Sequence, residues 1–253
     1  MRDDSKTGKL YLIGAGPGDP ELLTLKAVRV LGQCDVVLYD RLVNKAILQH
    51  AKPSAELIYV GKHPGEQERA QNEIFELIRR HAFRGQTVAR LKGGDPLVFG
   101  RGAEEWFLAL RDHIEVELIP GVTSAIAVPG LAGIPLTYRG VSQSFVIITG
   151  HCHEGRSDEW RRYVEVDTLV VLMGVRNREF IARSLIAAGR RPEEPVAFVM
   201  RGTMAGEQVA ESTLEDVAAG RTDIQPPAVF VIGEVVRLRS KFRESQRRRG
   251  PAL

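Results

Sequence analysis

The sequence has few cysteines and no long apolar run. Only Cys34 and Cys152 occur among 253 residues, which excludes a disulfide framework and favours a reducing compartment. No apolar stretch approaches the roughly 18–20 residues that cross a bilayer. The polar N-terminal segment MRDDSKTGK also lacks the apolar core of a secretory signal. We therefore expect a soluble, cytoplasmic protein without a membrane partner.

Most of the chain also lacks an excess of positive charge. The formal net charge is +3, but residues 237–253 hold seven Arg or Lys against one Glu and carry +6, which leaves −3 for residues 1–236. A basic tail alone is weak support for nucleic-acid binding, so no nucleic-acid partner is expected. The 43% hydrophobic content excludes a disordered chain and suffices for one large domain or two smaller ones.

Short apolar runs alternate with segments of helical period, which is typical of βαβ units and a largely parallel sheet. The clearest helix spans about 68–84, where Ile74, Leu77, Ile78 and His81 recur at helical spacing. The predicted strands are Leu10–Ile13, Val36–Tyr39, Glu56–Val60, Thr87–Leu91, Val116–Ile119, Phe145–Thr149, Thr168–Met173, Val196–Arg201, Gln208–Ser212 and Ala228–Ile232.

A Gly- and Pro-rich stretch at 120–137 interrupts this alternation and indicates a domain boundary. We expect an α/β fold of two domains with a ligand cleft between them. The predicted domains are 1–120, which carries the glycine loops, and 121–240. A basic tail at 241–253 is expected to be disordered.

Glycine-rich segments follow two of the predicted strands. GAGPGD (14–19) resembles a dinucleotide-binding turn, but the G-x-G-x-x-G spacing fails because position 19 is Asp. RLKGGDPLVFGRGAEE (90–105) has exposed backbone at the carboxyl end of a strand, where α/β proteins bind ligands, and Lys92 and Arg101 add positive charge. Ordinary tight turns remain an alternative for both segments.

One short cluster carries side chains that bind metals. His151, Cys152 and His153 lie together in TGHCHEG, and imidazole and thiolate are natural zinc ligands. No second cluster completes a site, so no metal is expected.

Several longer strings occur in the order found in tetrapyrrole methylases. They are GAGPGDPELLTLKA, LYDRLV, GKHPGEQERAQNEI, RLKGGDPLVFGRGAEE, PGVTSA, GIPLTYRG, TGH, LVVLMG and PPAVFVIGEVV. From about Lys9 to Arg237 the chain resembles this family, and within it the branch that methylates uroporphyrinogen III. The resemblance implies a homodimer of two α/β domains that uses S-adenosylmethionine and releases S-adenosylhomocysteine. It implies methylation of two ring carbons to give precorrin-2, for sirohaem or cobalamin biosynthesis.

The resemblance also assigns residues to the methyl donor and to proton transfer. The implied cofactor contacts are Pro17, Gly93, Gly94, Asp95, Thr123, Ser124, Met173, Gly202 and Ala228. Asp40 is the implied proton acceptor and Lys62 the implied proton donor, and each also follows a predicted strand on the side of the glycine loops. Alternatives stay open: an ion pair with Arg41 or a helix cap for Asp40, and a solvated lysine or carboxylate anchor for Lys62.

The implied substrate is an octacarboxylate, which needs a local group of basic side chains. The candidates are Arg41, Lys62, His63, Arg101 and Arg139, with arginine the better anchor because its fork pairs two carboxylate oxygens. The string GKHPGEQER departs from the form near GKRxGxHS that is usual in the family. Because the match begins near Lys9, a fused dehydrogenase–ferrochelatase module is not expected. Removing the residues after Arg239 is expected to leave methylation intact.

Other functions remain open at this point. One is methylation of a later precorrin or cobalt-precorrin intermediate, and another is a methylase of the same fold that acts on a protein or RNA residue. A third is a non-catalytic module that binds a nucleotide or RNA, for which Asp40 and Lys62 must be dispensable.

Overall fold

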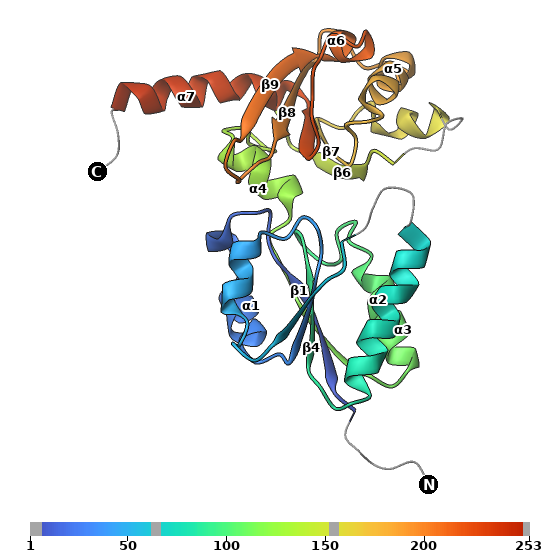
Figure 1. The fold of residues 1–253 in the computed structure, drawn as a ribbon. Coiled ribbons are helices and arrows are strands. Elements are labelled where there is room, and N and C mark those ends of the chain that lie inside the picture. Colours follow the sequence, from blue (N-terminus) through green and yellow to red (C-terminus); the bar gives the residue numbers. More distant parts are fainter. Residues whose placement is uncertain (1–6, 62–66, 152–156, 250–253) are drawn as a thin grey trace. The chain divides into compact units, whose positions relative to one another are not determined.

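The computed structural model describes residues 7–61, 67–151 and 157–249 of the chain. They belong to two compact units, Met1–Thr123 and Ser124–Leu253. Each unit has its own five-stranded sheet with helices packed on it (Figure 1). The division falls between Thr123 and Ser124, inside the Gly- and Pro-rich stretch, and the fold class is α/β as predicted.

The first unit contains a wholly parallel sheet with strand order β3-β2-β4-β1-β5. Its strands are β1 (Lys9–Gly14), β2 (Val36–Tyr39), β3 (Glu56–Tyr59), β4 (Val88–Lys92) and β5 (Glu115–Ile119). Since all five strands point the same way, their carboxyl ends meet at one edge. The glycine loops after β1 and β4 are therefore neighbours, although about 75 residues separate them in the sequence.

Helices cover both faces of this sheet. Figure 1 shows α1 (Leu25–Leu31) on one face and α2 (Gln67–Ala82) with α3 (Gly102–Arg111) on the other. Strand side chains alternate between the faces: Val37 packs in the core under α1, whereas Val36 and Leu38 pack in the core under α2 and α3. The helix predicted over 68–84 is confirmed, with Ile74 and Ile78 buried in that second core.

The second unit contains a mixed sheet with strand order β6-β7-β10-β8-β9. Its strands are β6 (Phe145–Thr149), β7 (Thr168–Leu172), β8 (Pro195–Met200), β9 (Gln208–Thr213) and β10 (Ala228–Ile232). Only β6 and β7 pair in parallel, so the expectation of a largely parallel arrangement is wrong here. The loop 201–207 is too short for a crossover connection, so β9 returns antiparallel to β8.

Two apolar cores flank this second sheet. One core lies under α5 (Arg178–Ala188), α6 (Leu214–Ala218) and the 3-10 segment η3 (Ser157–Tyr163), and it includes the stacked rings of Phe198 and Phe230. The opposite core packs α4 (Ser124–Leu131) and η4 (Glu234–Arg237) against the sheet. Helix α4 was not predicted, because its Gly- and Pro-rich sequence includes Pro129 within the helix.

The basic tail also differs from its expectation of disorder. Helix α7 (Leu238–Arg249) runs through most of it. The Arg239 side chain is buried, and its Nε donates a hydrogen bond to the carbonyl of Ala132 at 3.0 Å. The Phe242 ring packs edge-on against Tyr138. These contacts tie the first two turns of α7 to the body of the second unit.

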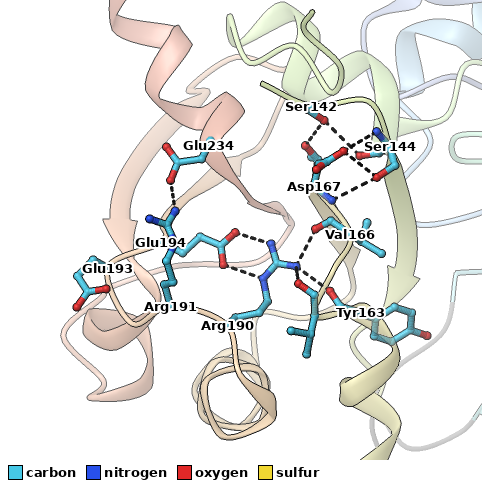
Figure 2. A network of polar contacts seen from close by, with 12 residues as sticks. Ser142, Ser144, Tyr163, Val166, Asp167, Arg190, Arg191, Glu193, Glu194 and Glu234 are labelled. Atoms are coloured by element: carbon cyan, nitrogen blue, oxygen red, sulfur yellow. Dashed lines mark hydrogen bonds and ion pairs between the residues drawn. The ribbon is translucent and has the colours of Figure 1, made fainter. Parts of the chain in front are cut away.

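A buried arginine links two segments of the second unit (Figure 2). The Nε of Arg190 donates to the Glu194 carboxylate at 2.7 Å, and Nη2 contacts the other oxygen of that carboxylate. Nη1 donates to the carbonyls of Tyr163 and Val166 at 2.7 and 2.9 Å. The guanidinium thus fixes the chain after η3 to the start of β8.

Replacing Arg190 tests this structural role. We expect Arg190→Ala to lower the free energy of unfolding by about 3–5 kcal/mol, since it leaves the Glu194 carboxylate buried and unpaired. The neighbouring Arg191 is exposed and pairs with Glu234, so Arg191→Ala is expected to cost about 0–1 kcal/mol. Urea unfolding followed by far-ultraviolet circular dichroism measures both, and equal effects of the two variants would contradict the assignment.

Candidate active site

The loops after β1, β4 and β5 are joined by backbone contacts at the carboxyl edge of the first sheet. Gly16 and Gly94 exchange two backbone hydrogen bonds, with N···O distances of 3.2 and 2.7 Å. The Asp95 carboxylate accepts from the backbone N–H of Gly121 at 3.1 Å and from that of Leu97 at 2.8 Å. Asp95, predicted as a cofactor contact, therefore also ties the β4 loop to the β5 loop.

Gly14 and Gly121 allow these loops to approach so closely. A Cβ atom on Gly121 would lie 2.3 Å from the Gly94 carbonyl oxygen and 2.7 Å from the Gly14 Cα. Such contacts are far shorter than van der Waals distances, so no side chain fits there. Pro17, Gly93 and Gly94, all predicted to contact the cofactor, lie on the loops that this packing fixes in place.

Asp40 lies directly after β2 at the same edge, and its side chain is about one-quarter exposed. It pairs with Arg90, whose Nη2 lies 2.6 Å from Asp40 Oδ1, and not with Arg41. Lys92 Nζ lies 4.0 Å from the other carboxylate oxygen. The predicted proton acceptor therefore contacts fixed cations on one side and is open to solvent on the other.

Behind Asp40, Glu105 completes a buried charge cluster. Its Oε1 accepts from Arg90 Nε at 3.2 Å, from Lys92 Nζ at 2.9 Å and from Gln71 Nε2 at 2.9 Å. The side chains of Arg90, Lys92 and Glu105 are each less than 5% exposed. The earlier interpretation that Lys92 adds positive charge to the ligand loop is therefore wrong, because Glu105 holds it inside the unit.

Sequence periodicity explains how this cluster assembles. Arg90 and Lys92 follow Val88 at strand spacing, so they point to the face covered by α2 and α3. Glu105 lies one turn before the buried Ala109 on α3, on the same helix face. The sequence reasoning missed Arg90, Glu105 and Gln71. The available signal was two cations at alternate positions of a buried strand, which require a buried partner.

The cluster sets the ionisation of its members. Burial opposes the charge on Arg90, but the carboxylates of Glu105 and Asp40 outweigh this and raise the Arg90 pKa above its ordinary value. Burial likewise opposes the charge on Glu105, yet the cations of Arg90 and Lys92 hold its pKa below the usual range. The pKa of Lys92 is lowered, chiefly by burial and then by the neighbouring Arg90. An Arg90–Glu105 ion pair therefore persists at neutral pH.

The predicted substrate-binding residues are spread over both units. Arg41 is exposed next to Asp40, and Arg101 immediately precedes α3, where its Nε donates to the Glu104 carboxylate at 3.0 Å. Arg139 is exposed on a turn of the second unit between Tyr138 and Ser142. Lys62 and His63, the remaining predictions, lie outside the described residues.

Three predicted cofactor contacts meet at one edge of the second sheet. Met173 follows β7, Gly202 lies just after β8, and Ala228 begins β10. Because β10 runs antiparallel to β8, Ala228 lies opposite the last residue of β8, Met200. A Cβ on Gly202 would lie 2.3 Å from Val128 of α4, so this position also requires glycine. Thr123 ends the first unit, and Ser124 begins α4.

Strained backbone accumulates at these same loops. Among the described residues, six non-glycine residues have positive φ. Five of them follow β4, β7 or β8, namely Phe99, Arg101, Met173, Arg201 and Thr203. Each such conformation costs about 1–3 kcal/mol, and such residues cluster at ligand sites. The positive φ values do not depend on any sequence motif. They occur in loops that also carry predicted cofactor contacts.

The edge of each sheet offers few large side chains to a ligand. Backbone and small residues predominate, and Met173 offers an apolar side chain that is 45% exposed. Of the HCH cluster, only His151 lies within the described residues, and it is exposed. No helix in the described part of the chain is long and apolar enough to cross a membrane.

Substitution of Gly121 tests the close approach of the loops. We expect Gly121→Ala to lower the free energy of unfolding by about 2 kcal/mol, since the added methyl overlaps the Gly94 carbonyl and the Gly14 Cα. Gly130→Ala is the matched control, because a Cβ there meets open space within α4. It is expected to raise stability by about 0.5–1 kcal/mol. Unchanged stability of Gly121→Ala in urea unfolding would refute the steric argument.

The family model for tetrapyrrole (corrin/porphyrin) methylases matches residues 9–218. A curated uroporphyrinogen-III C-methyltransferase from Methanocaldococcus jannaschii is 46% identical over 235 residues, which cover 91% of this chain and 97% of that protein. A siroheme synthase from Saccharophagus degradans is 45% identical over 241 residues, and this chain spans only 53% of its length.

Solved structures give the same result. The native form of uroporphyrin III C-methyltransferase from Thermus thermophilus is 48% identical to this chain with a TM-score of 0.81, and the match covers 91% of this chain and all of that one. A second Thermus thermophilus structure, with the same scores, is a complex with S-adenosylhomocysteine. The agreement of the family model, the relatives and the fold shows that this chain belongs to the tetrapyrrole methylase family.

Proposed function

We propose that this protein transfers methyl groups from S-adenosylmethionine to two ring carbons of uroporphyrinogen III, giving precorrin-2 for sirohaem or cobalamin biosynthesis. The observation that carries the proposal is the 46% identity to a methyltransferase of that activity over nearly its full length. The carboxylate of Asp40, held by buried cations beside glycine loops, is in keeping with it.

S-adenosylmethionine supplies an already activated methyl group, so the protein has to orient the reactants and exclude water. We propose that Pro17, Gly93, Gly94, Asp95 and Thr123 of the first unit contact this cofactor. The proposed contacts from the second unit are Ser124, Met173, Gly202 and Ala228. The close packing of Gly121 on backbone and of Gly202 on the Val128 side chain, together with the positive φ values in these loops, supports the assignment.

Asp40 is proposed to act on the tetrapyrrole. The methylated ring carbon carries no hydrogen, because each of the eight outer pyrrole positions of this octacarboxylate bears a side chain. Bond formation there leaves a positive charge on the macrocycle, which is removed when a neighbouring bridge carbon or the pyrrole nitrogen loses a proton, and a carboxylate at the site can accept that proton. Arg90 occupies Oδ1 of Asp40 at 2.6 Å, which directs the remaining lone pairs toward the exposed side. Lys62 is the proposed proton donor, and Arg41, His63, Arg101 and Arg139 are proposed to bind substrate carboxylates together with it.

We further propose that the protein works as a homodimer in the cytoplasm. Phe107 and Leu110, one turn apart on α3, are 69% and 55% exposed, which supports an apolar contact with a second copy. The low cysteine content, with Cys34 buried as a free thiol, suits a reducing compartment.

An anaerobic activity assay tests the proposed function. The wild-type chain, mixed with S-adenosylmethionine and uroporphyrinogen III, is expected to produce a coloured, fluorescent dipyrrocorphin after oxidation. Asp40→Asn is expected to lower kcat by about 100-fold or more, because the proton acceptor is lost. Asp216→Asn, a surface carboxylate on α6, serves as the control with unchanged turnover. Absence of product from fully reduced substrate with the wild-type chain would exclude this function.

A second prediction concerns substrate anchoring. Arg101→Ala is expected to raise KM for the tetrapyrrole by about 10-fold, since one charge-assisted contact is removed, while the dissociation constant of S-adenosylhomocysteine changes less than about twofold. Arg111→Ala, at the other end of α3, is the matched control and is expected to change neither quantity. Equal losses of substrate and cofactor binding in Arg101→Ala would count against the assignment.

A further inference from the structure

Glu105 has no assigned part in the reaction, yet no charged residue described in the first unit is more deeply buried. Its side chain is 0% exposed, and three donors converge on its Oε1 from α2 and β4. Its Oε2 is buried without a hydrogen-bond partner. Such an arrangement is expensive in free energy, because burying a carboxylate among cations costs several kcal/mol before pairing offsets it. An apolar core built from residues other than Arg90, Lys92 and Glu105 would avoid that cost, so the charged cluster asks for a role beyond packing.

The geometry of Arg90 connects Glu105 to the edge of the sheet. Its Nε is held by Glu105 at 3.2 Å, and its Nη1 by the carbonyls of Leu38 and Leu91 at 3.4 and 3.3 Å. The planar guanidinium is therefore fixed on two of its three nitrogens. The third, Nη2, is the one that reaches Asp40 at 2.6 Å. Any rotation of Arg90 away from Glu105 also moves Nη2 away from Asp40.

We propose that Glu105 is a positioning residue for methyl transfer: acting through Arg90, it holds the Asp40 carboxylate in the orientation in which it accepts the proton. The proposal rests on the proposed function of Asp40. Glu105 touches neither reactant. Among the described residues, the cations in contact with Asp40 are Arg90 and Lys92 of β4, and Glu105 of α3 fixes both of them.

A double-mutant cycle on the full-length protein tests the proposal. Single-turnover methylation of uroporphyrinogen III is measured with radiolabelled S-adenosylmethionine for wild type, Glu105→Gln, Asp40→Asn and the double variant. We expect Glu105→Gln to lower the rate by about 10-fold to 100-fold, since misplacing a reacting group by about 1 Å has an effect of this size. In the Asp40→Asn background the same substitution is expected to lower the residual rate less than about twofold.

Separate measurement of KM and kcat distinguishes a positioning role from a general disruption of the structure. The KM for the tetrapyrrole and the dissociation constant of S-adenosylhomocysteine are expected to stay within about twofold of wild type, because Glu105 contacts neither ligand. Glu76→Gln, on the exposed face of α2 where Glu76 pairs with Arg79, is the matched control with wild-type kinetics. If Glu105→Gln does not fold, Arg90→Lys takes its place in the double-mutant cycle. Lysine keeps a positive charge between Glu105 and Asp40, but it lacks the planar guanidinium that bonds to both.

The outcomes distinguish this inference from the proposed function. An equal loss of rate in the wild-type and Asp40→Asn backgrounds, or no loss from Glu105→Gln, overturns the positioning role alone. Full activity of Asp40→Asn overturns the assignment of Asp40 as proton acceptor. Failure of the wild-type chain to methylate uroporphyrinogen III overturns the proposed function itself.

Discussion

The buried guanidinium of Arg90 is the interaction on which the first unit depends. A cation this deep needs acceptors for its N–H groups, and those of Arg90 come from β2, from Asp40 after β2, from β4 and from α3. The hydrogen bond to Arg90 therefore fixes the side chain of Glu105. Oε1 of Glu105 in turn accepts hydrogen bonds from Lys92 and Gln71 and holds both side chains in place. The one member of this cluster that reaches solvent is Asp40. The hydrogen bonds that the buried Arg90 requires thus fix the position of the Asp40 carboxylate at the edge of the sheet.

Glycine sets a second constraint at the same edge. The β1, β4 and β5 loops lie so close that Gly14, Gly94 and Gly121 contact one another through backbone atoms. In the second unit Gly202 lies against the Val128 side chain, and Met173, Arg201 and Thr203 adopt positive φ in the loops after β7 and β8. Ligand-binding loops usually sacrifice stability for a fixed shape. Here the energy that offsets their strain comes from the apolar cores on both faces of each sheet.

The sequence predicted the elements more completely than the site. The ten strands of the described residues were predicted within one or two residues of their observed ends, because most of them are buried and produce clear apolar runs. The direction of β8, β9 and β10 was not predicted, since it depends on loop lengths and pairing rather than on periodicity. Helix α4 was not predicted because of its Gly and Pro content. The tail was predicted to be disordered because its composition gives no indication of the contacts that Arg239 and Phe242 make at the start of α7. The motifs located Asp40 and Asp95, but the partners of Asp40 come from distant positions that only the fold brings together.

The most direct test of the account is a crystal structure of the full chain with S-adenosylhomocysteine and uroporphyrinogen III, prepared without oxygen. We expect a tetrapyrrole ring carbon near the sulfur of the cofactor product, with the exposed oxygen of Asp40 about 3 Å from the neighbouring bridge carbon or pyrrole nitrogen that gives up its proton. Arg90 is predicted to remain on Oδ1 and Glu105 on Arg90. A substrate bound away from Asp40, or an Asp40 carboxylate turned from Arg90 toward another partner, would contradict it.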